Sequence, residues 1–416
     1  MSDDLLELGR RAQAARRLTS QLSSEAKDAA LRASADLLDS RRDQVLEANG
    51  TDMERAERAG TSASVLDRLR LTPSRVEAMA EGLRQVAALG DPIGEAVEGW
   101  VRPNGLEIRK VRVPLGVIGI IYENRPNVTS DAAALCLKSG NVAFLRGSSA
   151  AITSNQAVAS VLRAGYAKAG VPEDALLLVE DTSRESAVEF MRMRGVIDCL
   201  IPRGGRSLID AVIASATVPT IIDGDGNCHV YVDRAADLDS AVAIVANGKT
   251  QRPSVCNATE SLLVHAEVAD RFLPAVVAAL DGVELRGDAA ARRVVGRARM
   301  GEATDEDFST EHLALILSVA VVPDISAAID HIGRHGSGHT EVIVTADLAA
   351  ARRFQREVDA AAVVVNASTR FTDGEQFGFG AEIGISTQKL HARGPMGLRE
   401  LTTTKYLVTG EGHIRP

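Results

Sequence analysis

One cysteine in the sequence occupies a setting suited to nucleophilic chemistry. Cys256 lies in segment 251–257, QRPSVCN, a polar loop with a proline between a helix-patterned stretch and a strand-like run. A thiol reacts as its thiolate, which nearby positive charge favours, and Lys249 and Arg252 lie close in sequence. The other three cysteines lie in or beside apolar runs: Cys136, Cys199 and Cys228. Because free cysteine is often buried packing material, the loop alone supports a nucleophile and a packing residue about equally.

Two strand-following segments could assist such a nucleophile. Asn124, in GIIYENRPN, follows an apolar run, where an amide can donate to a developing oxyanion, although asparagine is also common in turns. The segment 202–209, PRGGRSLI, follows a second apolar run and opens a helical pattern. Gly204 and Gly205 would let backbone amides approach a phosphate at that helix start, and a simple tight turn is the equally supported alternative.

Several familiar motifs are absent from the sequence. No G-x-G-x-x-G follows the first strand-like run, and Gly224-Asp-Gly226 lacks a third glycine and leads into a strand-like run. The P-loop spacing is also missing. No G-x-S-x-G elbow is present either, which disfavours a serine hydrolase. His335 and His339 have i,i+4 spacing, but Gly-Ser-Gly separates them, so we expect a loop and no metal site.

Composition narrows the class of protein. The chain has 416 residues, 45% hydrophobic and 25% charged, which is typical of a globular protein of two or three domains. Aromatic residues make up 3%, so we expect an aliphatic core. The net charge is −9 and no basic stretch is interleaved with aromatics, which argues against nucleic-acid binding.

The cysteine pattern and hydropathy predict a cytoplasmic protein. Four cysteines without CxxC spacing do not form a disulfide framework. The N-terminus lacks the apolar core of a signal peptide. No apolar run reaches the roughly 18 residues that a membrane span needs, so we expect no membrane partner.

The elements that must position these residues follow a clear order. Residues 2–89 read as helices, with Ser23 or Ser24 and Thr72-Pro73 as helix starts, and suggest a layer over a later sheet. Asn104-Gly105 then predicts a polar hairpin with arms at 100–102 and 107–113. We expect this hairpin to extend a sheet or to join subunits. The polar strand expected near the C-terminus could pair with it.

Short apolar runs then alternate with helical patterns, which predicts parallel sheets covered on both faces. The first series of runs lies at 117–121, 142–146, 176–179, 197–201 and 219–222. A second series lies at 261–265, 314–322, 342–345 and 363–366. The loop of Cys256 enters the second series, so we expect an active site in a cleft between two α/β domains.

Together these pieces resemble the aldehyde dehydrogenase superfamily, and within it the gamma-glutamyl phosphate reductase branch. The marks, in family order, are VPLGVIGIIYENRPNVTSDAAALCLKSGN, LIPRGG, GNCHVYVD, KTQRPSVCNATE, HGSGHTEVIVT, FGFGAEIGIST and RGPMGLRELTTTKYLV. The resemblance implies two Rossmann-like α/β domains and a β-hairpin oligomerisation element. We expect a cofactor-binding domain at 1–96 and 115–240, a catalytic domain at 241–383, and an oligomerisation segment at 97–114 and 384–416.

The resemblance also implies a reaction and its residues. It implies NADPH-dependent reduction of L-glutamyl 5-phosphate to L-glutamate 5-semialdehyde and phosphate, a step of proline biosynthesis. Cys256 matches the nucleophile that forms a thioester, and Asn124 matches the oxyanion-stabilising asparagine. The expected cofactor-binding residues are Arg146, Gly147, Ser148, Ser149, Gly204, Gly205 and Glu311. Ser149 replaces a glutamate that binds the adenosine ribose in many NAD-dependent members, which favours NADPH.

One departure from the superfamily concerns the base that activates water. Hydrolytic members carry a glutamate ahead of the strand at HVYVD, where this chain reads TIIDGDGNCH, with Asp223 nearest. Phosphate as the exchanging group depends less on such a base, so the departure agrees with acyl-phosphate chemistry. Asp223 as a shifted base stays open. Residues expected to contact the substrate are Arg125, Lys249, Arg252 and His339.

Two other readings stay open at this stage. A CoA-acylating aldehyde dehydrogenase of the same superfamily also works without the glutamate base. A catalytically silent protein on the same fold is the second, and the presence of both Cys256 and Asn124 argues against it. We expect a homo-oligomer, and association with the upstream glutamate kinase is a further expectation.

Overall fold

The computed structural model describes residues 2–415. They form two compact units. Unit 1 extends through Asp223 and includes Gly378–Gly384 and the segment from Met396; unit 2 comprises Gly224–Phe377 and Ile385–Pro395. Among the described residues, no helix is both long and apolar enough to cross a membrane.

Unit 1 is built on a four-stranded parallel sheet with strand order β5-β4-β3-β6. Its strands are β3 (Val117–Tyr122), β4 (Val142–Gly147), β5 (Leu176–Leu178) and β6 (Cys199–Arg203). All six residues of β3 are buried, as expected for an apolar strand covered on both faces. The predicted parallel sheet is therefore confirmed.

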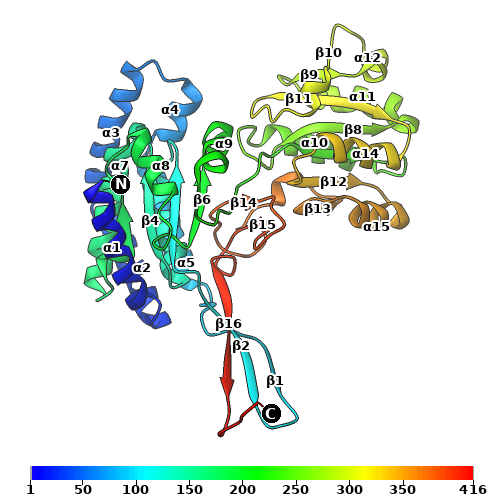
Figure 1. Ribbon diagram of the computed structural model, residues 1–416. Coiled ribbons are helices and arrows are strands. Elements are labelled where there is room, and N and C mark those ends of the chain that lie inside the picture. Colours follow the sequence, from blue (N-terminus) through cyan, green and yellow to red (C-terminus); the bar gives the residue numbers. More distant parts are fainter. Residues whose placement is uncertain (1, 416) are drawn as a thin grey trace. The chain divides into compact units, whose positions relative to one another are not determined.

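Helices cover both faces of this sheet (Figure 1). One face packs against α1 (Asp3–Thr19), α8 (Arg184–Met191) and α9 (Arg206–Ser215) through a shared apolar cluster. The other face carries α6 (Asn127–Lys138) and α7 (Ile152–Lys168). An outer layer packs on those two helices and consists of α2 (Ser24–Ser40), α3 (Arg42–Arg58) and α5 (Pro73–Ala88). Short elements complete the unit: α4 (Ala63–Leu69), η1 (Ser149–Ala151) and η2 (Glu173–Ala175).

The helix starts follow the expected capping chemistry. The Ser23 hydroxyl accepts a hydrogen bond from the amide of Ala26, and Thr72 caps α5 with Pro73 as its first residue. The predicted starts of these two helices are confirmed. Of the early helices, α1 packs on the sheet itself, whereas α2, α3 and α5 pack on the helices that cover its other face.

The strand predicted at 219–222 is wrong. This segment forms a single isolated parallel bridge, between Thr220 and Leu200 of β6. Two backbone hydrogen bonds hold it there, from the Leu200 amide to Pro219 and from the Ile221 amide to Leu200. The run is apolar enough to be buried, but it aligns with the edge of the sheet at one residue pair only.

A separate antiparallel sheet in unit 1 is formed by β1 (Ala96–Val101), β2 (Glu107–Pro114) and β16 (Thr402–Thr409). The strands extend away from the helix-covered sheet of the same unit (Figure 1). Strand β16 pairs with β2 from Thr402 opposite Pro114 to Thr409 opposite Glu107. The expected pairing of the C-terminal strand with the polar hairpin is confirmed.

Unit 2 contains a seven-stranded parallel sheet with order β10-β9-β11-β8-β7-β12-β13. The strands are β7 (Cys228–Val232), β8 (Thr259–His265), β9 (Glu284–Gly287), β10 (Gly301–Glu302), β11 (Ile316–Val322), β12 (Thr340–Val344) and β13 (Ala362–Val365). The helices are α10 (Leu238–Thr250), α11 (Ala266–Ala279), α12 (Ala289–Val295), α13 (Asp305–Phe308), α14 (Ile325–His335) and α15 (Leu348–Glu357). Short segments complete it: η3 (Thr369–Phe371), β14 (Ile385–Ser386) and β15 (Gly394–Pro395).

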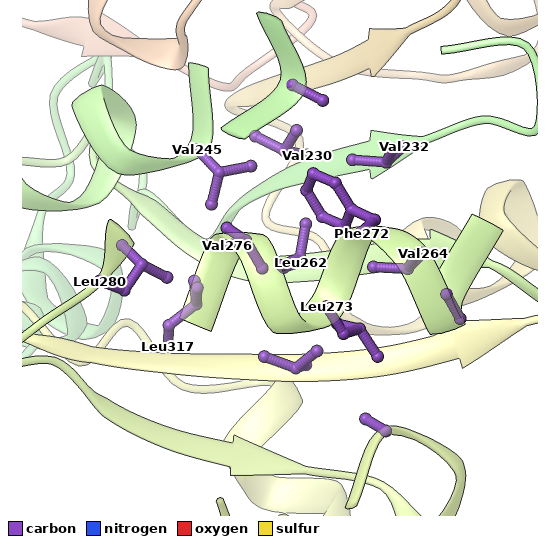
Figure 2. Packing of buried hydrophobic residues seen from close by; sticks show 14 of the residues in the cluster. Val230, Val232, Val245, Leu262, Val264, Phe272, Leu273, Val276, Leu280 and Leu317 are labelled. Carbon is purple, nitrogen blue, oxygen red and sulfur yellow. The ribbon is translucent and has the colours of Figure 1, made fainter. Parts of the chain in front are cut away.

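Alternating strand residues build two cores on the faces of this sheet. Leu262 and Val264 of β8 point toward α10, α11 and α12, where Phe272 is the central aromatic residue (Figure 2). Leu263, between them, joins the cluster on the opposite face with α14 and α15. This alternation is the period-two pattern of a strand. The expectation of a largely aliphatic core holds in the first of these clusters.

The second sheet includes one strand from the stretch expected to end the cofactor-binding domain. Strand β7 pairs with β8 and β12, although residues 115–240 were expected to form the first domain. The predicted boundary after residue 240 falls inside α10, whereas the compact units divide after Asp223. An apolar run in a sequence does not reveal which of two sheets it will join.

Candidate active site

Cys256 lies in the loop between α10 and β8 of unit 2 and is half-buried, while the other three cysteines are buried. The Cys228 thiol donates to the main-chain carbonyl of Cys256 across 3.2 Å. A Cβ atom at Gly226 would lie 1.6 Å from that same carbonyl oxygen, so only glycine fits there. The start of β7 therefore holds the backbone of the Cys256 loop in place.

A second segment fixes the other side of this loop. The Asn257 side-chain amide donates to the carbonyl of Thr372 across 2.8 Å. The Arg370 Nε donates to Gln251 Oε1 across 2.7 Å. Element η3 and its flanks thus bond to the loop on both sides of Cys256.

Positive charge gathers beside the loop. Burial lowers the pKa of the Arg370 guanidinium, Asp373 opposes this shift, and the charge of Arg252 adds to it. The Cys256 thiolate interacts favourably with Arg370. The predicted substrate residue Arg252 is exposed, which keeps its charge available to an anion.

The predicted substrate residue Lys249 forms a buried ion pair with Glu260. Its Nζ bonds to Glu260 Oε2 across 2.6 Å, and both side chains are completely buried. Burial lowers the pKa of Lys249 and raises the pKa of Glu260 to about 7, while each partner favours the charged form of the other. Direct contact with a substrate would require Lys249 to leave Glu260.

Glu311, predicted to hold the nicotinamide ribose, lies beside the same glycine as the nucleophile loop. Its Oε1 accepts from the Gly226 amide across 2.8 Å. The amide of Gly226 therefore bonds the carboxylate of Glu311. The Cα of the same glycine lies close to the carbonyl of Cys256.

His339, a further predicted substrate residue, is completely buried. Its Nδ1 lies 2.8 Å from the Thr340 hydroxyl and 3.6 Å from the Cys228 thiol. Burial raises the pKa of Cys228 well above its ordinary value, so this thiol stays protonated and can donate. His339 therefore lies against the Cys228 thiol, which bonds the Cys256 carbonyl.

Three histidines, His229, His331 and His335, pack against one another. His335 ends α14, and its ring centroid lies 4.5 Å from that of His331. Within residues 2–415, no group of three or more histidine, cysteine or acidic side chains is arranged to hold a metal ion.

Asn124 follows β3 in unit 1 with a positive φ of 45°, a backbone conformation that asparagine tolerates. Its Oδ1 accepts from the Ser148 hydroxyl across 3.1 Å. Because the carbonyl end of the amide is bonded, its NH2 end is directed away from Ser148 as a donor. The neighbouring Arg125, a predicted substrate residue, is half-buried.

The predicted adenosine-binding residues Arg146, Gly147, Ser148 and Ser149 span the end of β4 and the start of η1. Arg146 Nη2 donates to the carbonyls of Thr182 and Ser183, both across 2.8 Å, and burial lowers its pKa. Arg55 of α3 donates to the Ser149 carbonyl across 3.0 Å. Two guanidinium groups therefore flank this turn.

The predicted pyrophosphate turn at Gly204 and Gly205 joins β6 to α9, with Gly205 as the N-cap. The Gly205 amide donates to Glu123 Oε2 across 3.1 Å. A phosphate would have to replace this carboxylate to use the amide. Nearby, Asp223 forms an ion pair with Arg203, which holds its carboxylate as an acceptor for the guanidinium.

Comparison with known proteins supplies the family. A family model described as the aldehyde dehydrogenase family matches residues 2–297. The gamma-glutamyl phosphate reductase of Thermobifida fusca is 56% identical over 414 residues, 99% of each chain. The chain belongs to the aldehyde dehydrogenase family, in its gamma-glutamyl phosphate reductase branch. Family members of this branch are oxidoreductases, and the expectation of an enzyme is confirmed.

Solved structures agree with this placement. The crystal structure of gamma-glutamyl phosphate reductase from Thermotoga maritima has a TM-score of 0.96 at 48% identity and covers 100% of both chains. An acetylating aldehyde dehydrogenase from Geobacillus thermoglucosidasius has a TM-score of 0.70 at 18% identity, covering 99% of this chain and 98% of its own. The second likeness is one of fold alone, and it confirms the predicted aldehyde dehydrogenase-like fold.

Sequence reasoning gave no site role to several side chains that bond the predicted site residues or the Cys256 loop: Arg55, Glu123, Cys228, Glu260 and Arg370. Glu123 directly precedes Asn124 and could have been noticed as a second polar residue after a strand. No comparable local signal marks Arg370, because it reaches the loop only through the path of the chain after β13.

Proposed function

We propose that this enzyme reduces L-glutamyl 5-phosphate to L-glutamate 5-semialdehyde with NADPH, releasing phosphate, as a step of proline biosynthesis. The curated relatives that match 98–100% of this chain are named gamma-glutamyl phosphate reductase, and this match carries the proposal. Cys256 is half-buried, and its main-chain carbonyl accepts a hydrogen bond from the Cys228 thiol. Its own thiol is suited as the nucleophile of that reaction.

The reaction begins at Cys256. Its thiolate attacks the C5 carbonyl, a carbon–sulfur bond forms, and the bond to the phosphate oxygen breaks with phosphate carrying away the electron pair. The product on the enzyme is a glutamyl thioester. NADPH supplies the hydride that reduces this carbonyl, and collapse of the resulting thiohemiacetal returns the thiolate and releases the aldehyde.

Asn124 stabilises the oxygen that becomes negative in both addition steps. Its NH2 group is free to donate because Ser148 bonds the carbonyl end of the same amide. The main-chain amide of Cys256 is the second donor in this proposal.

The residues of the β4 turn fit a phosphorylated adenosine. Ser149 carries no charge there, and Arg55 and Arg146 are positive groups within hydrogen-bond reach of the turn or its neighbours. These two guanidiniums would hold the 2′-phosphate of NADP. Gly204 and Gly205 would contact the pyrophosphate once Glu123 moves, and Glu311 would hold the nicotinamide ribose.

The arrangement of the acidic groups favours phosphate over water as the acyl acceptor. Asp223 is paired with Arg203, so a proton-accepting role would first require that ion pair to open. The exposed Arg252 and the half-buried Arg125 remain as candidate substrate contacts. Lys249 and His339, which are fully buried, would act through their neighbours.

The exposed antiparallel sheet supports self-association. Trp100, Val101, Tyr406 and Val408 are exposed on its strands, between 39% and 66% of each residue. We propose that β1, β2 and β16 join subunits of a homo-oligomer. We also propose that the enzyme associates with the kinase that forms the acyl phosphate. A cytoplasmic location agrees with four cysteines that form no disulfide.

A substrate-exchange assay separates this function from CoA-dependent acylation. The purified enzyme is given glutamate 5-semialdehyde and NADP, with phosphate, CoA or neither, and NADPH formation is followed. We expect turnover with phosphate alone and faster turnover with NADP than with NAD. Turnover that needs CoA and ignores phosphate would identify an acylating enzyme of the other type.

A further inference from the structure

Several hydrogen bonds join the segment around Arg370, residues 369–372, to the nucleophile loop and the strand that follows it. Besides the bond from Arg370 to Gln251, the Asn257 amide donates to Thr372 and the Thr259 and Thr369 hydroxyls lie 3.2 Å apart. These contacts precede and follow Cys256 in the sequence. The position of Arg370 beside the nucleophile loop is therefore fixed by the fold.

The bond to Gln251 also orients the guanidinium. It uses Nε, which leaves the two Nη groups for another partner. Among residues 2–415, the Arg370 side chain forms no ion pair and no hydrogen bond other than the one to Gln251. Two parallel N–H groups of one guanidinium match the oxygens of a phosphoryl group.

The charges around Arg370 favour an anion with more than one negative charge. Arg252 is exposed and forms no ion pair within the described chain. The carboxylate of Asp373 accepts from the amides of Glu375 and Gln376, so its charge is directed to them. Burial is the main cause of the lowered pKa of Arg370, and the charge of Arg252 lowers it further, so a bound dianion would offset both effects.

We propose that Arg370 binds the phosphoryl group of the substrate and the phosphate that leaves, with Gln251 orienting its guanidinium and Arg252 adding charge. The inference rests on the proposed function, because it assumes that phosphate leaves the carbon that Cys256 attacks. That geometry requires the phosphoryl site to adjoin Cys256. The substrate's α-carboxylate has a single charge and lies at the other end of the molecule, so it fits this place less well.

Arg370→Met tests the assignment, with Arg356→Met on α15 as the control of equal charge change. Alkylation of Cys256 by iodoacetamide is measured with increasing inorganic phosphate, and each protein is compared with its own unprotected rate. Losing a charge-assisted contact should raise the half-protecting phosphate concentration about 10- to 100-fold. Arg356→Met should match the wild type.

Turnover gives a second readout. In the phosphate-dependent oxidation of glutamate 5-semialdehyde, Arg370→Met should raise the KM for phosphate far more than the KM for the semialdehyde. Gln251→Ala keeps the guanidinium but removes the acceptor that orients it, so it should raise the KM for phosphate by a smaller factor, about 3-fold. This variant keeps the test available should Arg370→Met fold poorly.

The opposite outcomes are distinct. Unchanged phosphate protection in Arg370→Met, or a raised KM for the semialdehyde alone, would overturn the assignment while leaving the proposed function intact. A wild-type enzyme that phosphate neither protects nor supports in turnover would instead overturn the proposed function, and this inference with it.

Discussion

The ammonium of Lys249 and the carboxylate of Glu260 meet at 2.6 Å with both side chains completely buried. The two residues belong to α10 and β8, the elements on either side of the Cys256 loop. The pair therefore connects the end of the helix to the start of the strand that the loop joins. A lysine that resembles a substrate contact in the sequence is a structural support of the nucleophile loop.

Removing this lysine should destabilise unit 2 in a pH-dependent way. Lys249→Met leaves Glu260 buried without its partner, which costs about 3–5 kcal/mol. Because burial raises the folded-state pKa of Glu260 above its ordinary value, the folded state takes up the proton first as pH falls. The loss of unfolding free energy, measured with urea, should be larger at pH 8 than at pH 6.

The matched control is the double variant Lys249→Met with Glu260→Leu, which removes both charges and should recover most of the lost stability. A Lys249→Met enzyme of normal stability but raised KM for phosphate would contradict the structural role and assign Lys249 to the substrate.

Gly226 should be intolerant of any side chain. In Gly226→Ala the new Cβ would overlap the Cys256 carbonyl, and the loop or the start of β7 must shift. A displacement of about 1 Å at a nucleophile can lower kcat by about 100-fold. Steady-state kinetics and the alkylation rate of Cys256 measure the effect.

Gly333→Ala provides the comparison, because Gly333 lies in α14 and its Cβ would meet open space. That change should raise stability by about 0.5–1 kcal/mol and leave activity unchanged. Full activity in Gly226→Ala would show that the close approach of Gly226 to the Cys256 carbonyl does not position the nucleophile.

Ser149→Glu should weaken the preference for NADP. The new carboxylate would repel the 2′-phosphate and engage Arg55, which already bonds the Ser149 carbonyl. We expect the ratio of kcat/KM for NADP to that for NAD to fall by about 10-fold or more, equivalent to about 1.4 kcal/mol. Ser160→Glu, on the exposed face of α7, carries the same charge change and should keep the ratio. An unaltered ratio in Ser149→Glu would place the 2′-phosphate elsewhere.

His331 should make unit 2 sensitive to acid. Burial lowers its pKa to about 3, with the charges of His229 and His335 acting in the same direction. The unfolded state, with an ordinary pKa near 6.5, binds the proton first, so stability is present above that pH and is lost as pH falls toward 3. Between pH 7 and pH 5 this group should contribute a loss of about 2 kcal/mol.

His331→Leu removes the titrating ring and should lose correspondingly less stability over the same pH interval, measured by urea unfolding at both pH values. Equal losses in the wild type and the variant would show that His331 does not titrate differently on unfolding.

The sequence was sufficient for the parallel sheets, the capped helices and the hairpin, because each has a local periodicity or turn signal. It was insufficient for tertiary placement. The run at 219–222 is as apolar as its neighbours but contributes a single bridge. Strand β7 joins the second sheet, although it lies in the stretch expected to form the cofactor-binding domain.

The same distinction applies to the candidate site. Cys256 and Asn124 stand out through local context. Lys249 pairs with Glu260, which lies 11 positions further along the chain. Arg370 bonds Gln251, from which it is separated by 119 positions. No local pattern encodes those contacts.

The most direct test of the account is phosphate-dependent NADP reduction by the wild type and by Cys256→Ala and Cys256→Ser, with glutamate 5-semialdehyde as substrate. We predict that wild-type activity rises with phosphate to saturation and that both variants, folded as judged by circular dichroism, lose at least about 1,000-fold in kcat because no thioester can form as before. A folded Cys256→Ala enzyme that kept wild-type turnover would contradict the mechanism.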